Sequence, residues 1–253
     1  MTSRIASTTL QRTFEEDGYV ILRGYLDTAE ISEVLKNVQR YIETVIPRMP
    51  SEQVYYEIPG QSESLKQIQK LHDYDRFFEA LFVKSRLRGL AKDLLGEEVN
   101  PTNMQYFSKP PRVGKSTPAH QDGYYFKIKP KKALTMWLAL DAIDTENGCI
   151  RYVRGAHNQG LRAHQRTQTL GFSQGLVAFT DEDRAREIPI TASPGDLIVH
   201  HCLSVHRADA NESDRTRRAL GFIYYAASVE EDLAEGAAYQ ASLINDLKKQ
   251  GKL

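Results

Sequence analysis

A series of short strand-like segments in the second half of the chain restricts the fold more than any other feature of the sequence. Each segment is rich in apolar, aromatic or β-branched residues, and clusters of Gly, Pro, Asn and Asp separate one from the next. The segments cover Met104–Phe107, Leu134–Leu140, Cys149–Val153, Leu176–Phe179, Asp196–His201 and Arg217–Ala226. Many short strands at this spacing favour a β-sandwich or a barrel.

The first part of the chain has a helical pattern instead. Asp27 followed by Glu30 indicates a capped helix start. The apolar residues after it recur at helical spacing and would form one apolar face: Ile31, Val34, Leu35, Val38 and Ile42. A second helical run is expected from Asp73 to Leu95, and Gly96 would end it.

At 253 residues, the chain is of a length that often forms one domain, and we expect a single domain over residues 1–253. Within it, residues 8–97 are predicted to be mainly helical support. Residues 98–227 would form the β core, and residues 228–253 a C-terminal helix or tail.

The charge balance limits the partners of the protein. The sequence has 33 Lys and Arg against 33 Asp and Glu, so its formal net charge is zero, and nothing favours binding to nucleic acid or to an anionic membrane surface. No apolar run reaches the length of a membrane span, and the N-terminus has no secretory signal pattern. Cys149 and Cys202 lie in apolar segments and are expected to be buried free thiols. We therefore expect a cytoplasmic protein that acts on a small molecule; a homodimer is compatible with the sequence.

The segment His120-Gln121-Asp122 is the strongest candidate for a metal site. On a regular strand, His120 and Asp122 would point to the same face. A third ligand would come from a distant segment that contains His200, His201 and His206. Two imidazoles and one carboxylate on one face of the metal are typical of non-haem Fe(II) oxygenases, in which the other face stays open for a co-substrate and O2.

Arg217 follows His206 by eleven residues, and its guanidinium could grip a carboxylate. On a strand, Arg217 shares a face with the small residues Ala219 and Gly221, which would leave room for a slender dicarboxylate. Arg218 shares the other face with Leu220, Phe222 and Tyr224, which indicates packing against helices. This pattern favours Arg217 as the residue that binds the far carboxylate of 2-oxoglutarate.

In this context, the ordered motifs of the chain resemble the phytanoyl-CoA dioxygenase (PhyH) family from about residue 14 to about residue 227. The resemblance is carried, besides the candidate ligands and Arg217, by segments at 17–26, 147–157, 194–201 and 211–220. It implies a mainly β fold with flanking helices, namely a double-stranded β-helix (jelly roll, cupin-like) buttressed by the N-terminal helices.

The resemblance also implies site residues. It assigns the distal metal ligand to His206, so that Fe(II) would be held by His120, Asp122 and His206. It places Lys66, Gln105 and Trp137 near 2-oxoglutarate. The family usually has a small hydroxyl residue two positions after the distal histidine, and this chain has Ala208 there. One polar contact is therefore missing or is supplied by another residue.

We expect a dioxygenase that uses Fe(II), 2-oxoglutarate and O2 to hydroxylate a small organic molecule or natural-product intermediate, with release of succinate and CO2. Tyr124, Tyr125 and Arg162 are candidates for the substrate side of the site. Asp122 argues against a halogenase, because halide binding needs that coordination position to be vacant. Two alternatives remain: a cupin-type metal-dependent hydrolase or isomerase, which would not need Arg217, and a non-catalytic protein of the same fold that binds the metal and 2-oxoglutarate. The sequence does not indicate the substrate.

Overall fold

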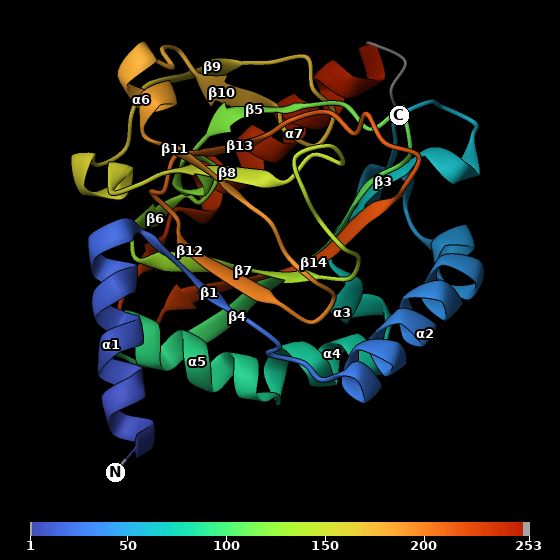
Figure 1. The fold of residues 1–253 in the computed structure, drawn as a ribbon. Coiled ribbons are helices and arrows are strands. Elements are labelled where there is room, and N and C mark those ends of the chain that lie inside the picture. Colours follow the sequence, from blue (N-terminus) through green and yellow to red (C-terminus); the bar gives the residue numbers. More distant parts are fainter. Residues whose placement is uncertain (1, 250–253) are drawn as a thin grey trace.

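Two β-sheets face each other, and helices cover the outer side of the larger one (Figure 1). The computed structural model describes residues 2–249, so the last four residues of the C-terminal helix or tail predicted for 228–253 lie outside the described residues. In the larger sheet seven strands, each antiparallel to its neighbours, follow the order β1 (Tyr19–Leu22), β12 (Leu197–His201), β7 (Ala133–Ala139), β14 (Arg217–Ala226), β4 (Val99–Lys109), β3 (Leu65–Ile68) and β2 (Val54–Tyr56).

The smaller sheet lies above the larger one in Figure 1 and carries most of the candidate ligands. Its four strands are antiparallel as well, in the order β11 (Glu187–Ile190), β8 (Ile150–Val153), β13 (His206–Ala208) and β5 (Thr117–His120). Two further antiparallel pairs are formed by β9 (His164–Arg166) with β10 (Gln174–Leu176) and by β6 (Ile128–Lys129) with β15 (Glu230–Glu231). The arrangement is the double-stranded β-helix expected from the sequence.

The helices of the N-terminal part form a layer against the outer face of the larger sheet. They are α1 (Thr2–Asp17), α2 (Thr28–Thr44), α3 (Leu71–Tyr74), α4 (Arg76–Val83) and α5 (Arg86–Leu95), while α6 (Asp181–Ala185) and α7 (Leu233–Lys249) lie elsewhere. Short 3-10 turns cover Ile46–Arg48, Ser51–Gln53, Ser62–Ser64, Asp122–Tyr124 and Ala156–Gln159. None of the helices described in the range 2–249 is both long and apolar enough to cross a membrane.

Local capping explains where these helices begin. The Asp27 side chain accepts hydrogen bonds from the backbone N–H groups of Ala29 and Glu30, and the Glu30 side chain accepts one from the Asp27 N–H, which confirms the predicted capping box. Gly96 ends α5 in the left-handed conformation, as expected.

The predicted continuous helix from residue 73 to residue 95 is wrong. Asp75 and Ser85 take extended backbone conformations and cap α4 and α5, so the segment forms separate helices. The mainly helical region at 8–97 also contains β1, β2 and β3; β1 pairs with β12, β3 pairs with β4, and β2 pairs with β3. Strands as short as these have little periodicity of their own, because pairing with other strands creates them.

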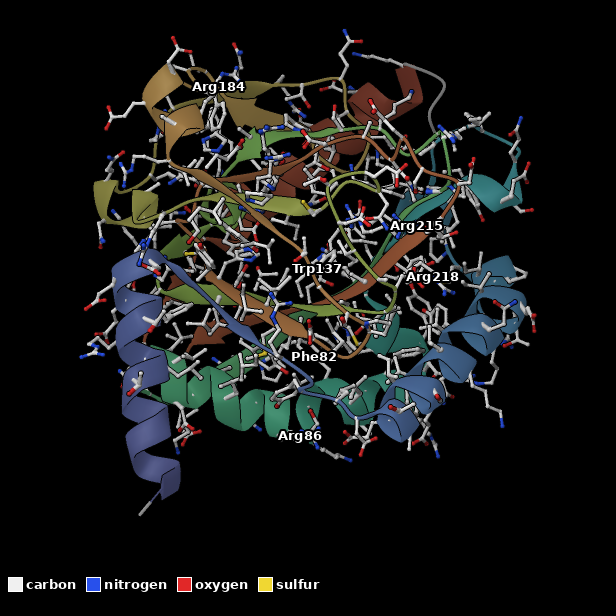
Figure 2. All side chains as sticks on the ribbon, in the orientation of Figure 1. Phe82, Arg86, Trp137, Arg184, Arg215 and Arg218 are labelled. Atoms are coloured by element: carbon white, nitrogen blue, oxygen red, sulfur yellow. The ribbon has the colours of Figure 1, made fainter. Side chains whose placement is uncertain are left out.

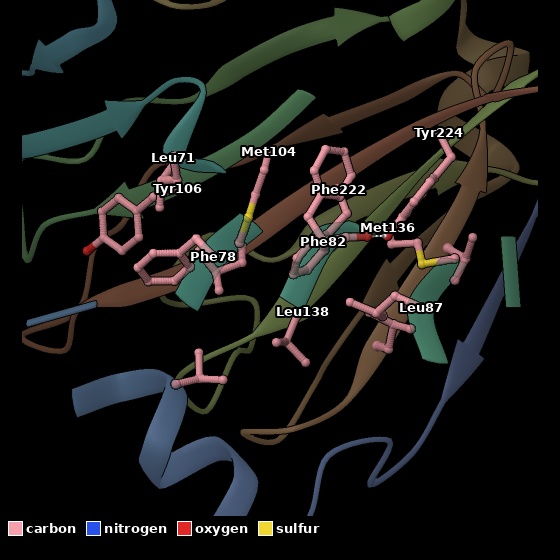
Figure 3. Close-up of a cluster of buried hydrophobic side chains, with 14 of the residues drawn as sticks. Leu71, Phe78, Phe82, Leu87, Met104, Tyr106, Met136, Leu138, Phe222 and Tyr224 are labelled. Atoms are coloured by element: carbon pink, nitrogen blue, oxygen red, sulfur yellow. Dashed lines mark hydrogen bonds between the residues drawn. The ribbon is translucent and has the colours of Figure 1, made fainter. Parts of the chain in front are cut away.

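The largest hydrophobic cluster lies between the seven-stranded sheet and the helices (Figure 3). Alternate residues of β14, namely Leu220, Phe222 and Tyr224, enter it, as predicted for that strand face. The Tyr224 hydroxyl donates a hydrogen bond of 2.8 Å to the backbone carbonyl of Phe82 in α4. Each large side chain buried here contributes on the order of 1.5–3 kcal/mol, so this layer anchors the sheet that carries Arg217.

The other face of the same strands points into the space between the two sheets. Trp137 of β7, labelled near the middle of the molecule in Figure 2, belongs to a second cluster with Ala219 of β14 and Ile198 of β12. Thr135, His200 and Arg217 are buried on this interior face. Because side chains alternate along a strand, one face of these strands packs against the helices, and the other face carries the polar site residues together with the second cluster.

Candidate metal centre

Three side chains from separate elements converge at one end of the interior. His120 ends β5, Asp122 begins the following 3-10 turn, and His206 begins β13. Asp122 Oδ1 lies 3.5 Å from His120 Nε2 and 3.7 Å from His206 Nε2. One donor atom from each residue lies within 4.8 Å of the other two, which is close enough for one metal ion. Asp122 is not on the strand face expected for it, because the chain leaves the strand after His120; the turn nevertheless brings the carboxylate to the imidazoles.

Backbone carbonyls fix the orientation of both imidazoles. His120 Nδ1 lies 2.8 Å from the carbonyl oxygen of Pro118, and His206 Nδ1 lies 3.0 Å from that of Ser204. A carbonyl can only accept, so Nδ1 of each ring carries the proton and Nε2 keeps its lone pair. Burial lowers the pKa of His206 well below its usual value, with a further contribution from His120 and His200, which favours the neutral form needed of a ligand.

The Asp122 carboxylate is held from its other side. Its Oδ2 accepts a 2.7 Å hydrogen bond from Thr135 Oγ1 and lies 3.0 Å from His200 Nε2. Burial alone would raise the pKa of Asp122, but the surrounding imidazoles of His120, His200 and His206 hold it well below its usual value. Oδ1 is therefore presented to the two Nε2 atoms as part of an ionised carboxylate.

The three histidines that were candidates for the distal ligand lie in different surroundings. His206 faces His120 across the β13–β5 pair, with ring centroids 4.2 Å apart. His200 binds Asp122 on one side and the Tyr152 hydroxyl, 2.7 Å from Nδ1, on the other. His201 points away and lies near the rings of Phe14 and His157. The geometry supports His206 as the ligand and gives His200 a role in positioning Asp122.

An inner cavity begins at these ligands and extends to Arg217. Lys66 and Trp137 also line it, as the sequence predicted for co-substrate contacts. Lys66 forms a 3.0 Å ion pair with Glu57, and both side chains are buried. The inner cavity therefore combines a metal site with cationic groups, an arrangement that suits a dicarboxylate.

Arg217 is buried at the far side of the inner cavity. Its guanidinium carbon lies 5.1 Å from the centroid of the Trp137 ring, and its Nε has no hydrogen-bond partner among the described residues. Burial lowers the pKa of Arg217 to about 10, which leaves it protonated at neutral pH. A buried cation with an unused donor is ready to bind an anion.

Arg218 leaves the strand on the opposite side, as predicted. Its guanidinium is bound to the Asp141 carboxylate, and in Figure 2 Arg218 lies toward the side of the molecule while Trp137 lies inside. The small residue Gly221 was expected to leave space beside Arg217, and this expectation is wrong. Gly221 does not widen the inner cavity, because a Cβ there would lie 2.8 Å from the Phe107 ring, so its small size accommodates that ring.

A second, larger cavity, the outer cavity, shares five lining residues with the inner one: Phe107, His120, Asp122, Thr135 and Phe172. Gln105 lines the outer cavity and not the inner one, although it was expected beside 2-oxoglutarate. It accepts a 3.1 Å hydrogen bond from Gln67. The outer cavity reaches the metal ligands from a second direction, as a substrate would have to.

One of the three predicted substrate-side residues lines a cavity, and the other two do not. Tyr125 lines the outer cavity. Tyr124 lines neither cavity, because the chain turns after His120, and its ring stacks on His164 with centroids 4.4 Å apart. Arg162 also lines neither; its guanidinium is bound to the Asp183 carboxylate by two 2.9 Å hydrogen bonds. The structure does not bring Tyr124 and Arg162 to the site.

Several residues at the site were not singled out from the sequence. Thr135 is two residues before Trp137 on β7, so strand alternation could have identified it. Phe172, whose ring centroid lies 5.4 Å from that of His120, comes from an irregular segment without any periodic signal. Cys149 and Cys202 are buried and free, as expected.

Comparison with known proteins agrees with this arrangement. The family model described as phytanoyl-CoA dioxygenase (PhyH) matches residues 14–219. A phytanoyl-CoA dioxygenase domain-containing protein 1 homolog of Caenorhabditis elegans is 25% identical over 83% of this chain and 88% of its own length. The peroxisomal phytanoyl-CoA dioxygenase of Bos taurus is 24% identical over 94% of this chain and 74% of its own length.

Solved structures share the fold. The epimerase SnoN, crystallised with Fe3+, alpha ketoglutarate and nogalamycin RO, superimposes with a TM-score of 0.72 at 23% identity, over 90% of this chain and 86% of SnoN. EctD from S. alaskensis, crystallised with 2-oxoglutarate and 5-hydroxyectoine, gives a TM-score of 0.73 at 20% identity, over 87% of this chain and 76% of EctD.

Proposed function

The chain belongs to the phytanoyl-CoA dioxygenase (PhyH) family, and from that premise we propose that it is an Fe(II)- and 2-oxoglutarate-dependent dioxygenase that hydroxylates a small organic molecule. The reaction is R–H + 2-oxoglutarate + O2 → R–OH + succinate + CO2. The observation that carries the proposal is the meeting, in one cavity, of the His120, Asp122 and His206 donor set with the buried cation of Arg217.

The donor set fits Fe(II). Two neutral imidazole nitrogens and one carboxylate oxygen are ligands that suit this ion, and three ligands leave room for 2-oxoglutarate and O2. When bound, the iron supplies the oxidative chemistry that converts 2-oxoglutarate to succinate and CO2 and oxidises the substrate. The chain itself holds the ligand atoms: Pro118 and Ser204 carbonyls orient the imidazoles, and Thr135 and His200 orient the carboxylate.

Arg217 would bind the carboxylate of 2-oxoglutarate that is distant from the metal. Its free Nε and its burial beside Trp137 support this role, since a charge-assisted contact is strengthened where water is excluded. Lys66, on β3 of the same sheet, lines the same cavity and would also contact the co-substrate. Ala208 provides no hydroxyl, so Arg217 would bear more of the carboxylate binding in this chain.

An anaerobic titration tests the proposal. Addition of Fe(II) and then 2-oxoglutarate to the protein should produce a weak visible charge-transfer band, and admission of O2 should release succinate. A cupin-type hydrolase or isomerase would show neither. A non-catalytic binding protein would show the band without succinate, so either result would refute the proposed activity.

A further inference from the structure

The outer cavity differs from the inner one in its chemistry. The inner cavity is lined by several cationic side chains, including Lys66, Lys109 and Arg217. Of the described residues that line the outer cavity, Lys70 is the sole cation, and it is solvent-exposed. A molecule held in the outer cavity by phosphate or carboxylate groups would find little positive charge there.

Amide side chains and aromatic rings make up much of the outer wall. The amides are Gln67, Gln69, Asn103, Gln105 and Gln240. Rings of Tyr55, Phe107, Tyr125, Phe126, Phe172, Tyr225 and Tyr239 supply flat apolar faces. Amides bind neutral hydrogen-bonding groups, while ring faces pack against flat or ring-shaped apolar surfaces. Together they suit an uncharged molecule with both kinds of surface.

Two acceptors at this wall have no partner. Gln67 Oε1 and Asn103 Oδ1 are buried, and neither has a hydrogen-bond partner within the part of the chain that the structure describes. Gln67 is only 3% exposed, and its Nε2 is used in the hydrogen bond to Gln105. Both oxygens are closed off from the cavity by neighbouring protein atoms, and Gln67 Oε1 packs against Gly171, where a Cβ would lie only 2.1 Å away. A buried acceptor left unpaired costs free energy, so each amide would gain by turning toward a ligand that brings hydroxyl donors.

The C-terminal helix closes this cavity from one side. Tyr239, Gln240 and Leu243 of α7 line it, although α7 follows the family-matched residues 14–219. The Tyr239 hydroxyl lies 2.6 Å from Ser173 Oγ, which joins α7 to the segment that carries Phe172. Part of the wall of the outer cavity therefore comes from a segment outside the match.

We propose that the outer cavity binds a neutral, hydroxyl-bearing ring compound, with the amides of Gln67 and Asn103 turning toward it to accept its hydrogen bonds and Tyr239 of α7 packing against it. This inference rests on the proposed function, because it names the class of molecule that is oxidised. The cavity shares His120 and Asp122 with the metal site, so a bound molecule lies within reach of the reacting centre. A fatty acyl-CoA or a simple carboxylic acid does not match these walls.

Anaerobic calorimetric titration of the protein loaded with Fe(II) and 2-oxoglutarate provides the test. The probes are phenyl β-glucoside, octanoate and octanoyl-CoA. The glucoside should bind most tightly, with a Kd of about 1 mM or below. Tighter binding of octanoate or octanoyl-CoA would overturn the proposal, and so would the absence of measurable glucoside binding.

Paired variants test the residues. Gln67→Met removes an acceptor at nearly constant volume and should weaken glucoside binding about tenfold. Gln53→Met is the matched control, because Gln53 also has a buried unpartnered Oε1 but lines neither cavity. Equal effects of the two substitutions would overturn the assignment. Tyr239→Ala should weaken binding of the glucoside without changing binding of 2-oxoglutarate.

The loading step separates this inference from the proposed function. If the Fe(II) and 2-oxoglutarate band does not form, the proposed function fails. If the band forms and the glucoside does not bind, the proposed function stands and only the substrate class is wrong.

Discussion

Thr135, on β7 of the larger sheet, donates a 2.7 Å hydrogen bond to Asp122 Oδ2, on the turn that follows β5 of the smaller sheet. The bond ties the candidate ligand carboxylate to the opposite wall of the jelly roll. It leaves Asp122 Oδ1 directed toward His120 and His206. The position of the carboxylate thus depends on how the two sheets pack, and not only on the turn that carries it.

Replacement of Thr135 by Val should weaken iron binding. The side chain keeps its shape but loses the donor, and loss of a residue that orients a ligand typically costs 10–100-fold in metal affinity. We expect the Fe(II) dissociation constant to rise by roughly tenfold, as measured by anaerobic competition with a chelator. Thr135→Ser keeps the hydroxyl and should remain near the wild type. Similar losses in both variants would mean that packing, rather than the hydrogen bond, is responsible.

Arg217→Ala should raise the KM for 2-oxoglutarate strongly. Loss of one partner of a buried charge-assisted pair costs roughly 2–5 kcal/mol, which corresponds to about thirtyfold or more. Arg217→Lys should rescue only part of the affinity, because an ammonium cannot reproduce the planar fork. Arg218→Ala is the control, since that side chain is bound to Asp141 away from the cavity. A large effect at Arg218 and none at Arg217 would contradict the assignment.

The variants His206→Ala and His200→Ala should differ in their iron content. His206→Ala removes a ligand and should abolish both iron retention and 2-oxoglutarate turnover while the fold survives. His200→Ala removes contacts to Asp122 Oδ2 and to the Tyr152 hydroxyl but no proposed metal ligand, so iron should still bind with lower affinity. Metal analysis and circular dichroism of both variants would check this. Normal iron content in His206→Ala would show that another histidine is the ligand.

Asp122→Ala should lose 2-oxoglutarate turnover altogether. The substitution removes the anionic ligand, so the remaining neutral site binds Fe(II) less well and has an additional open coordination position. Succinate release in the presence and absence of added Fe(II) measures the effect. Product formation at the wild-type rate would rule out the proposed triad.

Stability should fall in mild acid partly through His201. Burial, together with the charges of His157 and His200, lowers the pKa of His201 from 6.5 to about 4. Between these values the unfolded chain binds a proton that the folded protein does not. The free energy of unfolding should therefore decrease as pH falls from about 6.5 to about 4, by at most about 1.4 kcal/mol per pH unit from this group, with no contribution above that range.

Urea denaturation at several pH values within this window would measure that slope. The Leu203 N–H donates a 3.1 Å hydrogen bond to His201 Nδ1. In His201→Gln the amide oxygen can still accept a hydrogen bond from that N–H, but the side chain cannot titrate. The variant should lose stability less steeply in acid than the wild type. Identical slopes would show that other groups dominate the acid response.

Features that depend on local order could be predicted from the sequence. Strand alternation put Arg217 and Arg218 on opposite faces, because side chains on a strand alternate between faces, and the apolar segments located β4, β7, β12 and β14, but not β5, β11 and β13. The Asp27–Glu30 capping box and the Gly96 helix end were likewise readable, since each involves residues close together in the chain. The chemistry of His120, Asp122 and His206 indicated the kind of metal site before any contact was known.

Features that join distant segments became visible in the folded protein alone. Folding put Asp122 on a turn, held it with Thr135 and His200, moved Gln105 to the outer cavity, and left Tyr124 and Arg162 outside both cavities. It also brought α7 against that cavity and added β1–β3 to the larger sheet. None of these follows from periodicity, because hydrogen bonds and packing between segments far apart in the chain depend on how the two sheets and the helices meet in space.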